Sequence, residues 1–315
     1  MVVTITRRKY TRPLIDHPIY CGAVNVNELE TRQGQSGSSV ATRRNQQNEA
    51  NRTHVTKRSR QRGLEYQYCT QKCLSGLIND GPIDHDCPNA SLHGRQPINH
   101  ATFLELLWKQ LEASLDDGIW PLGIGGSRGV LFKVTLLEFG YTFVSKGTVR
   151  AFVVDLEHEA AVYARLKPLQ DTYVPVFLGA TDLQSMGKTY YYDHRVYVVH
   201  MSFMSWGGTR PDPHGGERLR EKAALSLRAI HNNGVIHGDV RGANMLCSDE
   251  MDGIMVIDFE RALLVPSPRP PLSPARSPIK RLRTEDPGQE RSSSKRGLQH
   301  LLASDRAAVS HLFEE

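Results

Sequence analysis

Long apolar runs are missing from this sequence of 315 residues. No stretch approaches the roughly 18 residues that a helix needs to cross a bilayer. The first residues also lack the apolar core and the cleavage site of a secretory signal. These absences argue against membrane-spanning and secreted classes of protein. We therefore expect an intracellular protein of the cytoplasm or nucleus with no membrane span.

Cysteine is also scarce, with five residues in the whole chain. In a reducing compartment, so few cysteines argue against a fold held by disulfides. Cysteines that cluster in such a protein are therefore considered first as metal ligands.

Large apolar residues are almost absent from residues 30–61, which are rich in Gln, Asn, Arg, Ser and Thr. Such a composition cannot bury enough surface to offset the entropy of ordering. We expect residues 1–64 to be largely disordered, and residues 266–296 to form a disordered linker rich in Pro, Ser and Arg. An amphipathic helix at residues 297–315 is expected to follow this linker.

Charge is nearly balanced, with 39 Lys and Arg against 34 Asp and Glu. Basic residues cluster at positions 57–62 and 280–283. Such clusters suit nucleic acid, a nuclear import receptor or an anionic membrane surface, and the alternative is a solvated, disordered tail. The pattern alone does not indicate a nucleic-acid partner.

Between these flanks, the periodicity of apolar residues predicts a helix, several strands, a second helix, further strands and a third helix. The expected helices are residues 101–115, 156–166 and 216–232. The expected strands are residues 130–137, 141–145, 151–154, 174–178 and 196–201.

The segment at residues 235–264, VIHGDVRGANMLCSDEMDGIMVIDFERALL, carries the strongest chemical pattern. Asp239 is followed five positions later by Asn244, and an apolar strand then leads to Asp258. Phosphoryl transfer needs a carboxylate for the acceptor hydroxyl and oxygen ligands for magnesium on the nucleotide phosphates. The spacing therefore predicts Asp239 as base and Asn244 and Asp258 as magnesium ligands.

This segment resembles the protein-kinase-like superfamily, in particular its HGD branch, which includes atypical kinases, aminoglycoside phosphotransferases and lipopolysaccharide kinases. The wider runs FKVTLLEFGYTFVSKGT, HEAAVYARL and FMSWGG resemble a fungal kinase-like group. The resemblance implies an α+β, two-lobed kinase-like fold at residues 101–265, with a complete N-lobe and a truncated C-lobe. It also implies ATP and magnesium as cofactors.

The resemblance assigns further residues to the site. Lys146 would hold the nucleotide phosphates, and Glu159 would pair with Lys146, because it shares a helix face with Tyr163. Glu157 is the alternative partner. Arg241 would neutralise the transferring phosphate.

A glycine-rich turn precedes the first long strand. Gly125, Gly126 and Gly129 could let backbone amides cradle phosphates. The pattern is irregular, because Ile124 takes the place of the first glycine of G-x-G-x-x-G.

Three departures from the family leave the acceptor open. Glu260 replaces the glycine of DFG, Gly238 replaces the arginine of HRD, and no APE-like triplet follows. We expect an ATP-dependent kinase, in the first place a protein Ser/Thr kinase. The alternatives are a nucleotide-binding pseudokinase that serves as an interaction module, and a small-molecule kinase of the aminoglycoside phosphotransferase type.

The clustered cysteines precede this core. The pattern C-x3-C-x13-C-x5-H is formed by Cys69, Cys73, Cys87 and His93, with His85 as an alternative ligand. Zinc favours four sulfur and nitrogen ligands in a tetrahedral array, whereas buried cysteines can also serve as small apolar residues. The pattern predicts a zinc-binding segment at residues 65–100, distant enough for its loss to leave ATP binding largely intact.

Overall fold

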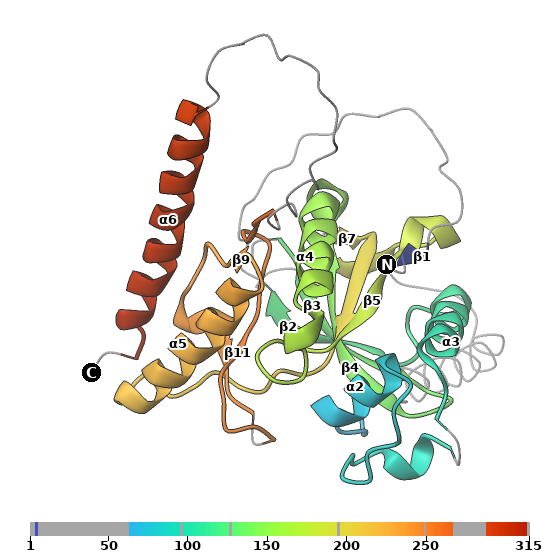
Figure 1. Cartoon of the computed structure of the whole chain (residues 1–315). Coiled ribbons are helices and arrows are strands. Elements are labelled where there is room, and N and C mark those ends of the chain that lie inside the picture. The colour runs from blue at the N-terminus through green and yellow to red at the C-terminus, as the bar shows by residue number, and fades with distance from the viewer. Residues whose placement is uncertain are drawn as a thin grey trace, which may run out of the picture.

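The structure of the chain, a computed structural model, describes residues 4–5, 63–94, 97–125, 128–193, 196–248, 250–266 and 288–313. These residues form a mixed α/β protein. The described α-helices are α2 (Gln71–Ile78), α3 (His100–Ala113), α4 (Val153–Arg165), α5 (Gly216–Asn232) and α6 (Gly288–Ser310). None of them is long and apolar enough to cross a membrane. Helices α2, α3 and α4 lie around a twisted sheet, whereas α5 and α6 lie to one side with the short strands β9 (Val235–Ile236) and β11 (Met255–Val256) (Figure 1).

The main sheet has six strands in the order β1-β5-β8-β4-β3-β2. Five of them run antiparallel to their neighbours: β2 (Ile119–Gly125), β3 (Val130–Leu136), β4 (Tyr141–Thr148), β5 (Phe177–Asp182) and β8 (His200–Met204). The short strand β1 (Thr4–Ile5) pairs in parallel with β5. The sheet therefore confirms the α+β class at the level of mixed helices and an antiparallel sheet.

Three smaller strand pairs complete the described strands. They are β6 (Tyr190–Asp193) with β7 (Val196–Val198), β9 (Val235–Ile236) with β12 (Leu263–Leu264), and β10 (Met245–Leu246) with β11 (Met255–Val256). Short 3-10 helices lie at Ala90–Leu92, Arg150–Phe152, Lys167–Leu169, Leu183–Met186 and Gly242–Asn244.

Side chains on the two faces of strand β4 contact different helices, because successive side chains of a strand point to opposite faces. Phe143 packs edge-on against Phe103 of α3, with 5.6 Å between the ring centroids. Lys146, three residues further along the strand, points to the opposite face and contacts Glu159 of α4. Helices α3 and α4 therefore cover opposite faces of the sheet at this strand.

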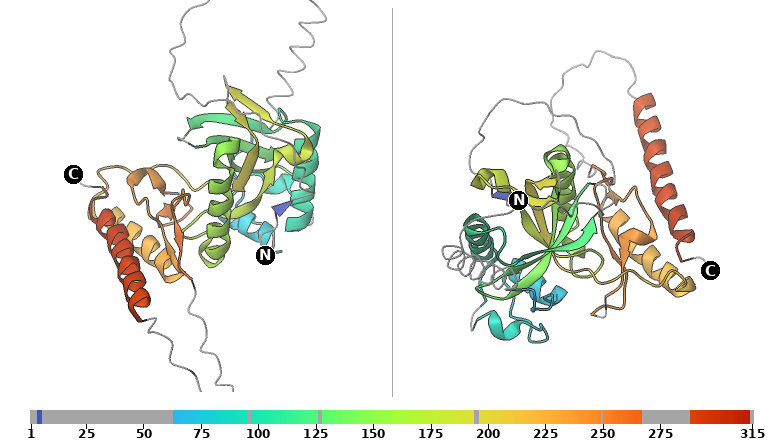
Figure 2. Two further views of the ribbon diagram at one scale, coloured as in Figure 1. Left: turned by 90° about the horizontal axis from the view of Figure 1, so that it is seen from above. Right: turned by 180° about the vertical axis from the view of Figure 1, so that it is seen from behind.

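The buried apolar side chains form two clusters. One joins the sheet to α3 and to the segment of α2, and it includes Phe103, Phe132 and Leu74. The other joins α4 and α5 to strands β9 to β12 and to the end of α6. In both views of Figure 2, α6 lies beside α5.

Local sequence explains where the helices begin. The side chain of Asn99 accepts a hydrogen bond from the backbone amide of Thr102 and so caps α3. Thr70 caps α2 in the same way at the amide of Cys73. The buried residues Phe103, Leu107 and Leu111 recur at helical spacing and fix the packed face of α3.

Three expected elements differ from the structure, and one of them is the strand expected at residues 174–178, which lies at Phe177–Asp182. Residues 151–154, expected as a strand, form part of a 3-10 helix and the first turn of α4. A short apolar run of this kind does not distinguish a buried strand from a buried helix. Helix α6 begins at Gly288, within the expected linker, because a packed helix can be extended at low cost once it has formed. The basic clusters at 57–62 and 280–283 lie outside the described residues.

Candidate functional site

The centre of the site is an ion pair between strand β4 and helix α4. The Nζ atom of Lys146 lies 3.0 Å from Oε2 of Glu159. Leu156 and Tyr163 are buried on the same face of α4, so the packing of the helix turns Glu159 toward the sheet. The pair that the sequence predicts is therefore formed, whereas the alternative residue, Glu157, is exposed.

Two further carboxylates reach the same ammonium group. Oδ1 of Asp258 and Oε1 of Glu260 each lie 2.8 Å from Nζ of Lys146. Burial alone would lower the pKa of Lys146, but the three carboxylates outweigh burial and raise it. Lys146 is therefore held in its charged form.

Glu260 also contacts a second cation. Its Oε2 lies 3.6 Å from Nη1 of Arg128, and the same Arg128 atom lies 3.4 Å from Oδ2 of Asp155. Arg128 lies two residues before β3, so these contacts link the glycine-rich turn to the loop after β11 that carries Asp258. At the level of sequence, Glu260 marks a departure from the family and favours the small-molecule kinase, but these contacts were not predicted.

Backbone geometry turns Asp258 toward Lys146. Asp258 has φ of +68°, which is uncommon for a residue other than glycine. The next amide, of Phe259, donates to Oε1 of Glu159 at 3.1 Å, and the Phe259 ring is fully buried. Burial would raise the pKa of Asp258, but the charge and hydrogen bond of Lys146 lower it overall.

The loop at residues 237–244 is arranged by a neutral histidine. Nδ1 of His237 accepts from the amide of Asp239 at 3.2 Å, and Nε2 donates to the carbonyl of Ile257 at 3.0 Å. This pattern requires one protonated and one free ring nitrogen. Burial also lowers the pKa of His237. The histidine thus joins the Asp239 loop to the strand before Asp258.

Asn244 and Arg241 hold the Asp239 side of the site. Nδ2 of Asn244 donates to the carbonyl of Asp239 at 2.9 Å and lies 3.4 Å from its carboxylate. Nη2 of Arg241 lies 3.3 Å from Oδ2 of Asp239 and 3.9 Å from Oδ2 of Asp258. The predicted residues Asp239, Arg241, Asn244 and Asp258 therefore lie in one connected group.

The glycine-rich turn lies beside Lys146. A Cβ atom on Gly129 would stand 3.1 Å from the carbonyl of Gly147 and 3.3 Å from Cγ of Lys146, so this position requires close backbone approach. Gly125 ends strand β2, whereas Gly126 lies outside the described residues.

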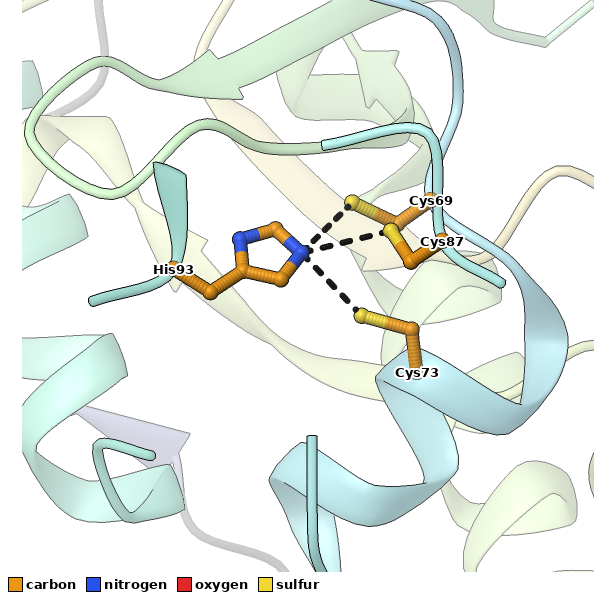
Figure 3. A group of neighbouring side chains, drawn as sticks. All are labelled: Cys69, Cys73, Cys87 and His93. Carbon is orange, nitrogen blue, oxygen red and sulfur yellow. Dashed lines mark hydrogen bonds between the residues drawn. The ribbon is translucent and has the colours of Figure 1, made fainter. Parts of the chain in front are cut away.

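A second group of side chains lies at α2 and the loop that follows it. Nε2 of His93 lies 3.3 Å from Sγ of Cys73, 3.3 Å from Sγ of Cys87 and 3.7 Å from Sγ of Cys69, as Figure 3 shows. All four residues are buried and could hold one metal ion. Tetrahedral zinc, with bonds of about 2.0–2.3 Å, places its ligand atoms roughly 3.5–3.8 Å apart. These distances fit that geometry.

His93 is oriented for such a role by its other ring nitrogen. Nδ1 donates to the carbonyl of Phe139 at 2.8 Å, so Nε2 is directed at the three sulfur atoms. The alternative ligand, His85, is exposed. Contacts with Cys69 and Cys73 lower the pKa of Cys87, while contacts with Cys69 and Cys87, together with burial, raise that of Cys73. A cation would allow all three thiols to ionise together.

Comparison with known proteins finds a meiotic driver among the relatives of this chain. No model of a known protein family matches the chain. Over an alignment of 218 positions that covers 66% of this chain, the sequence is 43% identical to the meiotic driver SPOK2 of Podospora anserina. The matched part covers 27% of that protein, so this chain spans about a quarter of the relative's length.

Asp305, on helix α6, also belongs to the site, although its role was not predicted from the sequence. Its Oδ2 accepts from the amide of His237 at 2.8 Å, and its Oδ1 accepts from the amide of Gly238 at 3.1 Å. Oδ2 also lies 3.0 Å from Nε2 of His231. No local pattern connects a residue of the last helix with a loop more than sixty positions earlier, so only the fold reveals this contact.

The same loop explains the glycine in the HGD motif. Gly238 has φ of +73°, and a Cβ atom there would stand 2.6 Å from the carbonyl oxygen of Arg261. Any side chain would therefore collide with backbone and strain the loop.

We expect Asp305→Asn to lower the free energy of unfolding by about 1–3 kcal/mol, because one buried amide of the loop loses its acceptor. Burial raises the pKa of the native Asp305 carboxyl, but its hydrogen bonds lower it overall. Its contribution is therefore complete above the unfolded pKa and lost as pH falls through the lowered folded value. Denaturant unfolding from neutral to acidic pH measures both effects.

The matched control is Asp212→Asn, at an exposed aspartate, which should leave unfolding unchanged. Equal stability of the Asp305 variant and the native chain at neutral pH would contradict a role for α6 in holding the loop.

Proposed function

We propose that this chain is an ATP- and magnesium-dependent phosphotransferase that acts on hydroxyl groups, as an atypical protein Ser/Thr kinase. The observation that carries the proposal is the convergence of Lys146, paired with Glu159, on Asp258, beside the Asp239 loop. Phosphoryl transfer is catalysed mainly by positioning and by charge, and these groups can supply both.

Each residue has a defined task in this proposal. Lys146 binds the nucleotide phosphates, and Asn244 and Asp258 hold magnesium on them. Asp239 accepts the proton of the acceptor hydroxyl. The acceptor oxygen forms a bond to the γ-phosphorus while the bond from that phosphorus to the bridging oxygen breaks, which leaves ADP. Arg241 offsets the charge of the transferring phosphoryl group.

The charge of the site also favours a divalent cation. Five carboxylates, those of Asp155, Glu159, Asp239, Asp258 and Glu260, lie against the three cations Arg128, Lys146 and Arg241. Two negative charges are thus in excess, which a magnesium ion would balance.

The two hydrophobic clusters support the further proposal of a two-lobed, kinase-like fold. Lys146 lies on the sheet, whereas Asp239 and Asp258 follow β9 and β11 and Asn244 directly precedes β10. Glu159 lies on α4, which packs in the second cluster and reaches Lys146 from there. A nucleotide bound between these elements would contact both groups. The 43% sequence identity with a meiotic driver supports the proposal that the transferase acts in meiotic drive.

A small-molecule acceptor is the second candidate. Glu260, which stands where protein kinases have glycine, is directed at Lys146 and Arg128 and resembles the acid of small-molecule kinases of the aminoglycoside phosphotransferase type. A pseudokinase would bind nucleotide without transferring phosphate. Acceptor choice separates the first two candidates, and turnover separates both from the third.

We expect calorimetry to detect ATP binding that depends on magnesium. Asp258→Asn should weaken the magnesium-dependent part of the binding, because it removes a carboxylate ligand. The exposed Asp212→Asn variant serves as control and should bind like the native chain. A folded native chain that binds no ATP in the presence of magnesium would contradict both the transferase and the pseudokinase proposals.

A further inference from the structure

The zinc-binding segment contacts the link between the two halves of the site. Residues 205–209, called here the connecting segment, run from the end of β8 to Thr209, which pairs with Cys247 of the C-terminal part. Lys146 lies on the sheet side of this segment, and Asp239 and Asp258 lie beyond it. Its conformation therefore sets how the two groups of site residues face each other.

Gln71, the first residue of α2, is directed into this segment. Its Nε2 donates to the carbonyl of Trp206 at 2.6 Å, and its Oε1 accepts from the hydroxyl of Ser205. The Ser205 hydroxyl in turn accepts from the amide of Val176 at 2.8 Å. Gln71 is 2% exposed, so these hydrogen bonds have little competition from water.

The same helix also reaches the C-terminal part. The backbone amide of Gln71 donates to Oε2 of Glu250 at 2.7 Å. Glu250 belongs to the loop between β10 and β11. A carboxylate is favoured at this place, because the first amides of a helix have no partner within the helix. Tyr68 adds a stacked contact with Trp206, with 4.8 Å between the ring centroids.

The zinc-binding segment is also fixed to the sheet. The amide of Cys69 donates to the carbonyl of Thr142 at 2.9 Å, and His93 binds the carbonyl of Phe139. Gln71 stands midway between two of the metal ligands, Cys69 and Cys73. A metal that holds these two cysteines would therefore also fix the position of Gln71.

We propose that the Cys3His site binds zinc and that the metal-bound segment is a brace across the connecting segment, with Gln71 as the positioning residue. Three thiols that converge on one imidazole nitrogen are explained by a shared metal, whereas packing alone would not require convergence. This proposal rests on the proposed function only where the test measures binding of magnesium-ATP. The sequence predicts that loss of the zinc-binding segment leaves ATP binding largely intact. These contacts lead us to expect instead that loss of the metal weakens ATP binding.

The test uses the full chain and three variants. Gln71→Ala should keep one zinc per chain but weaken binding of magnesium-ATP about 5- to 30-fold, because Ser205 and Trp206 each lose a buried partner. It should also speed amide hydrogen exchange at residues 205–209. Cys73→Ser should lose zinc and show both effects at least as strongly. Lys72→Ala, at a largely exposed neighbour in the same helix, should show neither.

Elemental analysis, calorimetry and hydrogen exchange give three separate readouts. A native chain without zinc overturns the metal site. A Gln71 variant with native exchange at residues 205–209 overturns the brace, even if the cysteine variant fails to fold. If the native chain binds no ATP, the proposed function fails, while zinc content and exchange still decide on the brace.

Discussion

Replacing Asp239 by Asn is expected to lower the rate of phosphate transfer by about 10²- to 10⁴-fold, the usual contribution of a positioned general base. The substitution preserves the shape of the side chain but removes its capacity to accept the hydroxyl proton. The backbone hydrogen bonds of the loop, from the Asp239 amide to His237 and from Asn244 to the Asp239 carbonyl, do not involve the carboxylate. The loop should therefore keep its geometry, and binding of magnesium-ATP should persist.

The rate is measured as transfer from labelled ATP under saturating nucleotide, with the exposed Asp212→Asn variant as control. A native rate in the folded Asp239 variant would remove this residue from the role of base and would leave positioning and charge as the only sources of catalysis.

The second large effect is expected at Lys146. Lys146→Met should lower turnover by about 10²- to 10³-fold through loss of charge on the phosphates. The structure adds a cost in stability, because Glu159, Asp258 and Glu260 would be left close together without their shared cation. Breaking a buried pair of this kind costs about 3–5 kcal/mol.

Lys146→Arg separates the two effects. The guanidinium keeps the positive charge and most of the stability, but it presents its donors as a planar fork at a different distance from the backbone. We expect a folded variant with strongly reduced turnover, measured by labelled transfer and by denaturant unfolding. The exposed Lys167→Met serves as control. Native turnover in the arginine variant would show that the site needs only a charge there.

The residues of the catalytic motifs could be predicted from the sequence, because their roles depend on spacing within one short segment. Asp239, Asn244 and Asp258 lie in a single run. The resemblance implies a glutamate partner for Lys146, and helical periodicity selects Glu159 for this role. The four residues of the cysteine and histidine cluster follow from ligand spacing for the same reason.

Contacts between distant segments could not be predicted in this way. Asp305 holds the His237 loop from the last helix, and Gln71 holds the connecting segment from the zinc-binding segment. The sequence marked Glu260 as a departure that favours a small-molecule kinase, but its contact with Arg128 could not be predicted, because that contact depends on how the turn before β3 lies over the strand end. Each of these contacts is set by packing between elements that no local pattern relates.

Phosphate transfer from labelled ATP to a mixed panel of proteins and metabolites tests the central claim most directly. The account predicts that the native chain, with magnesium, labels at least one hydroxyl-bearing member of the panel, and that Asp239→Asn does not. A labelled protein would favour the Ser/Thr kinase, and a labelled metabolite would favour the small-molecule kinase. Magnesium-ATP binding with no transfer to any acceptor, or equal labelling by the Asp239 variant, would contradict the account.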